Sequence, residues 1–275
     1  MKLCSFTVNG STHVGVFQNG GVIDLTAAGV AESMNELIKQ GSLSFNTQNL
    51  PIISEDRVKF AAVTEPSKIV CVGLNYKKHA EETGGTPPAE PVIFSKFNDA
   101  LSPHASAIKL PSWQRCFDYE AELVIVMGKE AWNIPEERAL DYVFGYTCGN
   151  DLSARDCQFI SSQWLIGKTF PGFAPAGPYI VTADSFDPFA SHRITCRRNG
   201  EIVQDSDIDD MIFNCAQLVS YISRYCRLSP GDLIFTGTPS GVVLGHEKGK
   251  RNWLKAGETI SVTIEGIGTL ENTLA

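Results

Sequence analysis

The stretch Asp118-Tyr119-Glu120-Ala121-Glu122-Leu123-Val124-Ile125-Val126 decides how the central part of the chain folds. Its second half is a continuous apolar run, which predicts a buried β-strand. Side chains two positions apart on a strand point to the same face, so Glu120 and Glu122 should lie side by side. Two adjacent buried anions repel each other and lose hydration, and they therefore need a cation or a shared proton. The alternative is that both carboxylates lie at a solvated strand edge.

A third carboxylate, Asp151, follows a predicted strand over Val143–Cys148. Carboxylate oxygens are the ligands that Mg²⁺, Mn²⁺ and Ca²⁺ prefer in proteins. Glu120, Glu122 and Asp151 are therefore candidate ligands of a divalent cation. Carboxylates are also common on half-exposed strands that hold no ion, so the residues alone leave both interpretations open.

The composition is that of a globular protein with a sizeable core, because 43% of the 275 residues are hydrophobic and 20% are charged. This length fits one large domain, or a large domain with a smaller appendage. The formal net charge of -8 argues against a nucleic-acid partner, which would need a basic patch on the protein.

The cysteines and the N-terminus bear on the cellular compartment. The eight cysteines form no Cys-x-x-Cys motif and have no histidine at zinc-ligand spacing, so we expect reduced, mostly buried thiols. The first residues lack the apolar run of a signal peptide, and no stretch reaches the roughly 18–20 apolar residues that span a bilayer. We therefore expect a cytoplasmic protein with no membrane partner.

The N-terminal residues predict a small strand-rich domain over residues 1–62, with no visible chemistry. Asn9-Gly10 and Asn19-Gly20 separate three apolar runs in the way that hairpin turns separate strands. A helix is expected over Val30–Lys39, closed by Gly41. Residues 42–66 are weakly patterned and are expected to form a linker or domain boundary.

A second candidate group lies on the helix that is predicted after the apolar strand ending at Gly73. His79 and Glu82 are three positions apart and hence neighbours on one helix face. A carboxylate beside an imidazole fixes its tautomer and stabilises its protonated form, which suits a general base. The alternative is a surface helix on which both side chains face water. The glycine-rich residues 84–88 beside it would allow this helix to move as a lid.

Two loops and one basic run complete the candidates. Lys168 stands in a loop rich in Gly, Pro and aromatic residues, where its ammonium should be partly desolvated. The loop Thr236–Gly241 can present backbone N–H groups and hydroxyls to a carboxylate, or it is an ordinary tight turn. The basic run 246–251 lacks the spacing of a phosphate-binding loop, so we reject that interpretation.

Helices are also expected over Pro135–Tyr142 and Ile212–Cys226.

Six motifs follow one another along the chain. They are Gly73-Leu-Asn-Tyr-x-x-His-x-x-Glu, Asp118-Tyr-Glu-Ala-Glu-Leu, Gly145-Tyr-x-x-x-Asn-Asp-Leu-Ser-Ala-Arg-Asp-x-Gln, Gly167-Lys-Thr-Phe, Asp210-Met-Ile-Phe and Thr236-Gly-Thr-Pro-Ser-Gly. In this order they resemble the fumarylacetoacetate hydrolase family, close to its acylpyruvases, fumarylpyruvate hydrolases and 2-hydroxyhepta-2,4-diene-1,7-dioate isomerases. The resemblance covers residues 68–275.

The resemblance implies an α+β fold, a mixed β-sheet roll in a catalytic domain of residues 63–275 that forms a homodimer. It also implies Mg²⁺, or Mn²⁺ or Ca²⁺, bound by Glu120, Glu122 and Asp151. The other implied site residues are His79, Glu82 and Lys168 in catalysis and Arg155, Gln158 and Thr238 in substrate binding. Phe97 and Pro171 depart from the family pattern near the expected pocket, where many members have proline and aspartate.

The resemblance implies hydrolysis of a C–C bond in acylpyruvate-like 2,4-dioxo acids. In that reaction His79, oriented by Glu82, activates water, and the cation stabilises the pyruvate enolate. An isomerase, tautomerase or decarboxylase acting on 2-oxo or 2-hydroxy dicarboxylic acids is the alternative on the same scaffold. A binding protein without activity is disfavoured, because the metal and dyad residues are all present.

Overall fold

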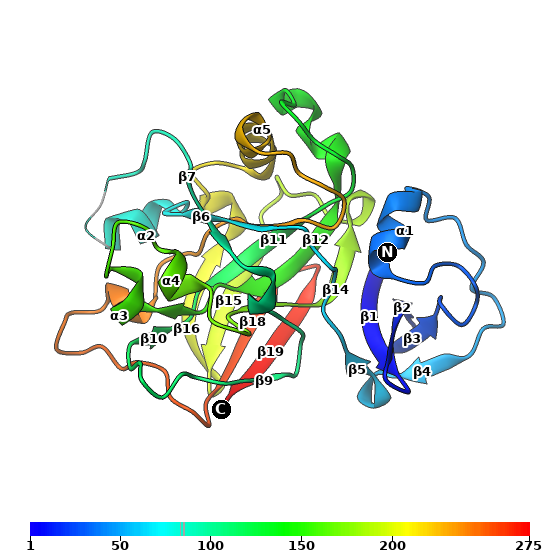
Figure 1. Cartoon of the computed structure of the whole chain (residues 1–275), viewed down its shortest axis with the longest axis horizontal. Helices are drawn as coiled ribbons and strands as arrows, with labels where there is room; N and C mark the ends of the chain where they lie inside the picture. Colours follow the sequence, from blue (N-terminus) through cyan, green and yellow to red (C-terminus); the bar gives the residue numbers. More distant parts are fainter. Residues whose placement is uncertain (83, 85) are drawn as a thin grey trace.

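The computed structural model describes residues 1–82, 84 and 86–275, and one large sheet runs through it. Its strands follow the order β4-β3-β2-β1-β14-β12-β11-β17-β6-β7, with β5 beside β1 and β8 beside β14. A five-stranded sheet has the order β16-β15-β18-β19-β9, and β10 pairs with β13. Figure 1 shows the five-stranded sheet beside the β11 and β12 part of the large sheet, with β1–β4 of the large sheet at the other end of the molecule.

The strands are β1 (Lys2–Val8), β2 (Ser11–Gln18), β3 (Gly21–Asp24), β4 (Ile52–Ser54), β5 (Lys59–Phe60), β6 (Ile69–Gly73), β7 (Val92–Lys96), β8 (Leu101–Ser102), β9 (Ala107–Ile108), β10 (Phe117–Asp118), β11 (Ala121–Met127), β12 (Val143–Asn150), β13 (Ser153–Ala154), β14 (Ala174–Thr182), β15 (Arg193–Arg198), β16 (Glu201–Asp207), β17 (Leu233–Phe235), β18 (Thr259–Ile264) and β19 (Gly268–Leu274). The α-helices are α1 (Met34–Gln40), α2 (Lys77–Glu82), α3 (Arg155–Gln158), α4 (Leu165–Lys168) and α5 (Cys215–Tyr225). Short 3₁₀ helices are η1 (Glu55–Arg57), η2 (Asn98–Ala100), η3 (Glu136–Tyr142), η4 (Ala183–Ser185), η5 (Ile208–Asp210) and η6 (Val243–Gly245).

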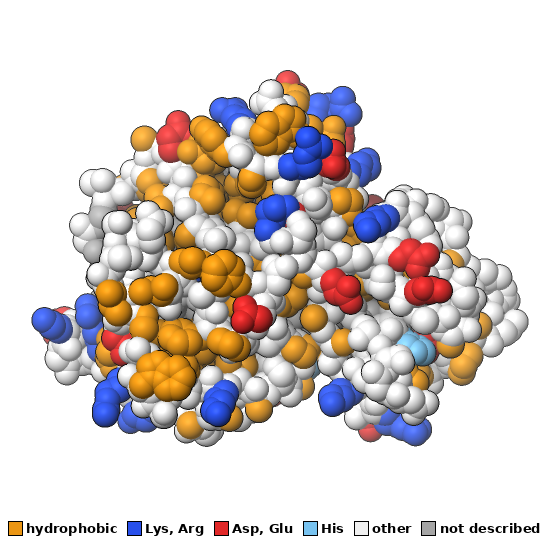
Figure 2. Space-filling model, viewed as in Figure 1, with side chains coloured by type: hydrophobic (Ala, Val, Ile, Leu, Met, Phe, Trp, Pro, Cys, Tyr) orange, Lys and Arg blue, Asp and Glu red, His pale blue; other side chains and the backbone are white. Residues whose placement is uncertain are grey.

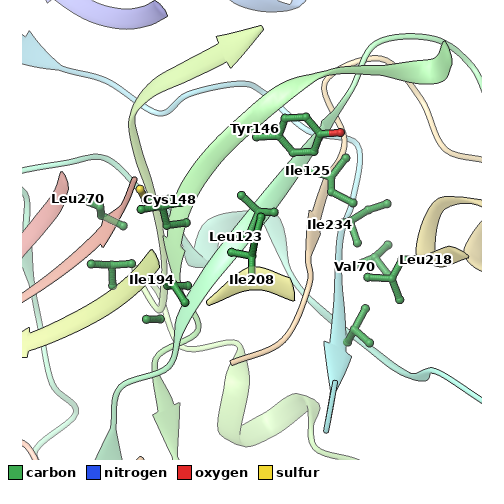
Figure 3. Packing of buried hydrophobic residues seen from close by; sticks show 14 of the residues in the cluster. Val70, Leu123, Ile125, Tyr146, Cys148, Ile194, Ile208, Leu218, Ile234 and Leu270 are labelled. Atoms are coloured by element: carbon green, nitrogen blue, oxygen red, sulfur yellow. The ribbon is translucent and has the colours of Figure 1, made fainter. Parts of the chain in front are cut away.

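Strand β11 is buried on both faces, which explains its continuous apolar run. Leu123 and Ile125 belong to a core cluster shared with β15, β18, β19 and α5, and Figure 3 shows their packing. Val124 and Val126 belong to a second cluster, shared with the N-terminal strands and α1. The two sheets therefore enclose the first cluster, and the second cluster packs on the other face of β11. The predicted mixed β-sheet roll is confirmed.

The N-terminal strands continue the large sheet, because β1 pairs antiparallel with β14 at Leu3↔Ile180. The predicted linker is wrong in part, since residues 42–66 contain β4, β5 and η1. These strands are only two or three residues long, too short to show the alternation by which a strand is recognised. The division of the chain at residue 62 stays a prediction.

The predicted helices are found with shifted boundaries. Helix α1 ends at Gly41, which adopts φ +65° as a helix-terminating glycine does. Helix α5 begins after Asn214, whose side chain accepts from Gln217 N in a capping box. The segment expected as a helix near residue 135 forms the 3₁₀ helix η3.

The surface of one face is shown in Figure 2. Basic and acidic side chains are interspersed there, and hydrophobic side chains gather over the part formed by the larger C-terminal region.

Within the described residues, no helix combines the length and apolar character needed to cross a membrane. The eight cysteines are all free thiols, and six of them are buried, as the sequence predicted.

We expect Leu3→Ala to lower the free energy of unfolding by about 3 kcal/mol, because Leu3 is fully buried. The four tryptophans, at positions 113, 132, 164 and 253, all lie outside residues 1–62. If the continuous sheet makes residues 1–62 and the rest of the chain unfold together, tryptophan fluorescence in a urea titration will report the lower stability of Leu3→Ala. Ser11→Ala, on an exposed residue, is the control. An unchanged tryptophan midpoint in Leu3→Ala would show that the two parts unfold separately.

Candidate metal centre and active site

Three carboxylates meet where β11 and β12 lie side by side. Glu122 is the second residue of β11, and Glu120 directly precedes that strand. Asp151 follows β12 and donates its backbone N–H to Glu120 O at 2.9 Å. One ligand atom of each carboxylate lies within 4.8 Å of the other two, and the three residues are 6%, 2% and 0% exposed. The alternative of a solvated strand edge is therefore wrong.

The arrangement fits a bound divalent cation. Glu122 Oε2 accepts a hydrogen bond from Gly237 N at 2.8 Å, but among the described residues no cationic side chain pairs with Glu122. Burial raises the pKa of Glu122 well above its usual value, and the charges of Asp151 and Glu120 raise it further. Charged oxygen donors that are buried together in this way favour binding of a hard cation.

Three buried cations surround the other carboxylates. Lys168 Nζ bridges Glu120 Oε2 at 2.5 Å and Asp151 Oδ2 at 2.8 Å, and Arg155 contacts Glu120 Oε1 at 2.6 Å. Lys96 Nζ lies 2.5 Å from Asp151 Oδ1. Burial alone would raise the pKa of Glu120, but Lys168 and Arg155 outweigh it and lower that pKa. The prediction that Lys168 is desolvated is confirmed, since it is 2% exposed.

Asp118 connects this cluster to the loop that contains η6. Its carboxylate accepts from Arg155 Nε at 2.9 Å, and also from the backbone N–H groups of Val243 and Leu244 at 2.8 and 2.9 Å. The side chain is completely buried. Asp118 therefore fixes the guanidinium that contacts Glu120 and, at the same time, the position of residues 243–244.

The pair predicted on α2 lies against the same loop. His79 Nδ1 is 3.5 Å from Glu82 Oε2, and both Glu82 oxygens accept from Gly241 N, at 3.2 and 2.9 Å. His79 is 6% exposed, so the alternative of a water-facing surface helix is wrong. The predicted lid depends partly on Gly85, which lies outside the described residues, and lid movement stays a prediction.

Thr238 has its hydroxyl oriented by a neighbouring amide. Gln204 Nε2 donates to Thr238 Oγ1 at 2.9 Å and to Pro239 O at 2.8 Å. Because the Thr238 oxygen accepts this bond, its O–H proton is available to donate elsewhere. Gln204 Oε1 also accepts from Ala121 N at 2.9 Å, so one side chain ties this loop to β11.

Asn75 holds three of the sequence motifs together. Its amide donates to Phe213 O at 3.0 Å and Thr236 O at 2.7 Å, and it accepts from Phe213 N at 2.8 Å. Gly237 packs on it with φ +103°, and a Cβ at Gly237 would lie 2.8 Å from Asn75 Cβ. Glycine is thus required where the backbone N–H reaches Glu122.

A cavity of about 430 Å³ opens beside these groups. Among the predicted site residues, His79, Glu82, Glu120, Glu122, Arg155, Gln158, Lys168 and Thr238 line it. Asp151 is fully buried and does not line the cavity. Neither Phe97 nor Pro171 lines it, so these departures from the family pattern do not contact the space for substrate.

Sequence reasoning missed four residues of this network, namely Asn75, Lys96, Asp118 and Gln204. Asn75 and Asp118 lie within two of the motifs, and Lys96 ends strand β7, where a charged residue after apolar ones signals a buried partner. Gln204 stands in β16 without any local signal.

The comparisons with known proteins agree with this geometry. A model of the fumarylacetoacetate hydrolase C-terminal domain matches residues 68–275. The fumarylacetoacetate hydrolase domain-containing protein 2 homolog of Dictyostelium discoideum is 42% identical over 289 residues, which cover 96% of this chain and 93% of that protein. The mitochondrial oxaloacetate tautomerase fahd2 of Xenopus laevis is 37% identical and covers 99% of this chain and 89% of its own length.

Among solved structures, the fumarylacetoacetate hydrolase of the psychrophile Exiguobacterium antarcticum superposes with a TM-score of 0.91 and 34% identity, covering 100% of this chain and 99% of its own. Fold and site thus define an enzyme scaffold with a buried acidic cluster that could hold a divalent metal. The chain belongs to the fumarylacetoacetate hydrolase family.

We predict that Glu122→Gln abolishes stabilisation by Mg²⁺ while leaving the metal-free protein at least as stable. The amide keeps an acceptor for Gly237 N–H but removes one of three mutually repelling carboxylates. For the unaltered chain, Mg²⁺ at about 100 times its dissociation constant should add about 2.7 kcal/mol. Thermal unfolding with and without Mg²⁺ measures this, with the exposed Glu130→Gln as control. An undiminished Mg²⁺ effect in Glu122→Gln would exclude Glu122 as a ligand.

We predict that Asp118→Asn lowers the free energy of unfolding by about 3 kcal/mol, because the buried Arg155 loses an ionic partner. Asp141→Asn is the matched control, since Asp141 pairs with Arg138 on the surface, and it should cost less than about 1 kcal/mol. Urea denaturation compares the two variants. Equal losses would contradict the role of Asp118 as a buried connection.

Proposed function

We propose that this protein is a divalent-metal-dependent tautomerase of a small 2-oxo dicarboxylic acid such as oxaloacetate. The observation that carries the proposal is the His79–Glu82 pair, which lines one cavity together with two of the three clustered carboxylates. The similarity to the Xenopus protein named oxaloacetate tautomerase supports the same reaction. Interconversion of keto and enol forms needs one group that moves a proton and a means of stabilising an enolate.

His79 is the group proposed to move the proton. Because its Nδ1 faces Glu82, the proton would be exchanged with C3 of the substrate at Nε2. The Glu82 carboxylate stabilises the imidazolium that forms when this proton is taken up. The backbone N–H of Gly241 holds Glu82 in place, so the ring keeps its orientation during the transfer.

The other groups of the cavity are proposed to bind and orient the substrate. When bound by Glu120, Glu122 and Asp151, a divalent cation supplies Lewis acidity that polarises a 2-oxo group. Thr238 donates its hydroxyl to the carboxylate beside the keto group, and the ammonium of Lys168 offsets negative charge developing on the 2-oxo oxygen. Gln158, whose Oε1 accepts from Arg155, presents its amide N–H groups to the substrate.

Hydrolysis of a C–C bond in acylpyruvate-like acids is the second candidate. The similarity to the solved Exiguobacterium structure, named a fumarylacetoacetate hydrolase, favours it. In this reaction His79 would take a proton from water rather than from substrate carbon, and the resulting hydroxide would attack the distal acyl carbon. The C–C bond would then break and release the enolate of pyruvate together with the acid of the acyl group. The two candidates therefore differ in products: tautomerisation leaves the substrate mass unchanged, whereas hydrolysis releases two acids.

We predict that the protein with Mg²⁺ accelerates enol-to-keto conversion of oxaloacetate, and that His79→Gln reduces kcat about 10²–10⁴-fold. Glu82→Gln should also reduce kcat, whereas Glu81→Gln, on the exposed side of α2, should not. The loss of enol absorbance measures tautomerisation of oxaloacetate. Mass analysis of the products from oxaloacetate and acetylpyruvate shows whether a C–C bond has been cleaved. Release of pyruvate from acetylpyruvate without tautomerase activity would support the hydrolase instead, and full activity in His79→Gln would contradict both mechanisms.

The homodimer and the cytoplasmic location remain predictions. The Xenopus relative is named as mitochondrial. If this chain is cytoplasmic, the two proteins occupy different compartments.

A further inference from the structure

The substrate proposed above carries two carboxylates, and the buried cations of the cavity are already engaged. Each of the three guanidinium nitrogens of Arg155 contacts an acceptor of the protein, on Asp118, Gln158 or Glu120. Lys168 is shared between Glu120 and Asp151. These groups balance the acidic cluster, so a second substrate carboxylate needs a positive charge from elsewhere in the cavity wall.

Arg251 is a cation of the same cavity wall, and no carboxylate of the described residues neutralises it. It lines the cavity, is half-buried, and donates from Nε to His246 O at 2.9 Å. Among the described residues, no carboxylate lies within ion-pair distance of its guanidinium, although most other arginines of this chain are paired. Its two Nη groups can therefore donate to a ligand, in the planar geometry that suits a carboxylate.

The backbone on both sides of Arg251 is anchored, so the guanidinium is presented from a defined position. Arg198 donates to Asn252 O at 2.5 Å and to Trp253 O at 3.1 Å. Leu254 N donates to Phe117 O at 3.0 Å, which ties this segment to the strand that precedes the metal cluster. The guanidinium also lies 5.9 Å from the Trp253 ring centroid. A positioned cation loses less entropy on binding than a freely moving one.

We propose that Arg251 binds the distal carboxylate of the substrate and so makes the enzyme selective for dicarboxylic 2-oxo acids. The inference rests on the proposed function and deepens it. The substrate then spans the cavity, with its 2-oxo acid end at the acidic cluster and Thr238, and its other end at Arg251. The neighbouring Lys250 does not share this role, because it is 73% exposed, pairs with Glu247, and does not line the cavity.

The test compares oxaloacetate with its 4-ethyl ester, which has no distal charge. In Arg251→Gln, KM for oxaloacetate should rise about 10–100-fold, as expected for a lost charge-assisted hydrogen bond. KM for the ester should stay within about twofold. Arg251→Lys keeps the charge but not the bidentate geometry and should fall between Arg251→Gln and the unaltered chain. Lys250→Gln removes the neighbouring charge from the same loop and should leave both substrates unaffected.

The outcomes separate the two proposals. If the unaltered enzyme converts both substrates and Arg251→Gln affects them equally, or affects neither, Arg251 is not the distal-carboxylate ligand and this inference is overturned. If Lys250→Gln raises KM for oxaloacetate as much as Arg251→Gln does, general electrostatic attraction explains the effect. Specific binding by Arg251 is then overturned. If the unaltered enzyme converts neither substrate, the proposed function itself fails, and the inference fails with it.

Discussion

The mutual neutralisation of buried charges is the constraint on which the rest of the structure depends. Arg155 and Lys168 reach Glu120 from α3 and α4, and Lys96 reaches Asp151 from the end of β7. Any one of these charges buried alone would cost several kcal/mol. The segments carrying them must therefore come together as the protein folds. Among the described residues, no cationic side chain pairs with Glu122, and burial beside Asp151 and Glu120 raises its pKa well above the usual value. The cluster therefore lacks one positive charge, which a bound metal ion would supply.

Hydrogen bonds of one loop connect the acidic cluster to the His79–Glu82 pair. Asp118 holds Arg155 on one side and the N–H groups of residues 243–244 on the other. The same loop supplies Gly241 N–H to Glu82, and its neighbour Gly237 supplies an N–H to Glu122. A single segment, residues 237–244, thus touches both the acidic cluster and the dyad. The proposed tautomerase and hydrolase reactions could both use this arrangement, because each needs a proton to be moved by His79 and an enolate to be stabilised.

Local pattern was sufficient for the features whose cause is local. The apolar run of β11 and the spacing of Glu120 and Glu122 predicted that these carboxylates lie side by side, and the i, i+3 spacing predicted that His79 and Glu82 are neighbours. The local pattern left open whether either pair is buried. The roles of Asp118 and Lys96 could not be predicted in this way, because their partners are distant in the chain. Strands β4 and β5 escaped prediction because a strand of two or three residues has no measurable period.

The most direct test of this account is a crystal structure of the protein with Mn²⁺ and oxalate, located by anomalous scattering. The account predicts one Mn²⁺ with oxygen atoms of Glu120, Glu122 and Asp151 in its coordination shell. Oxalate should complete the shell from the cavity side, within hydrogen-bonding distance of the Thr238 hydroxyl. Density with no Mn²⁺ at this cluster, or with Mn²⁺ bound only elsewhere, would contradict the central claim that these three carboxylates form a metal site.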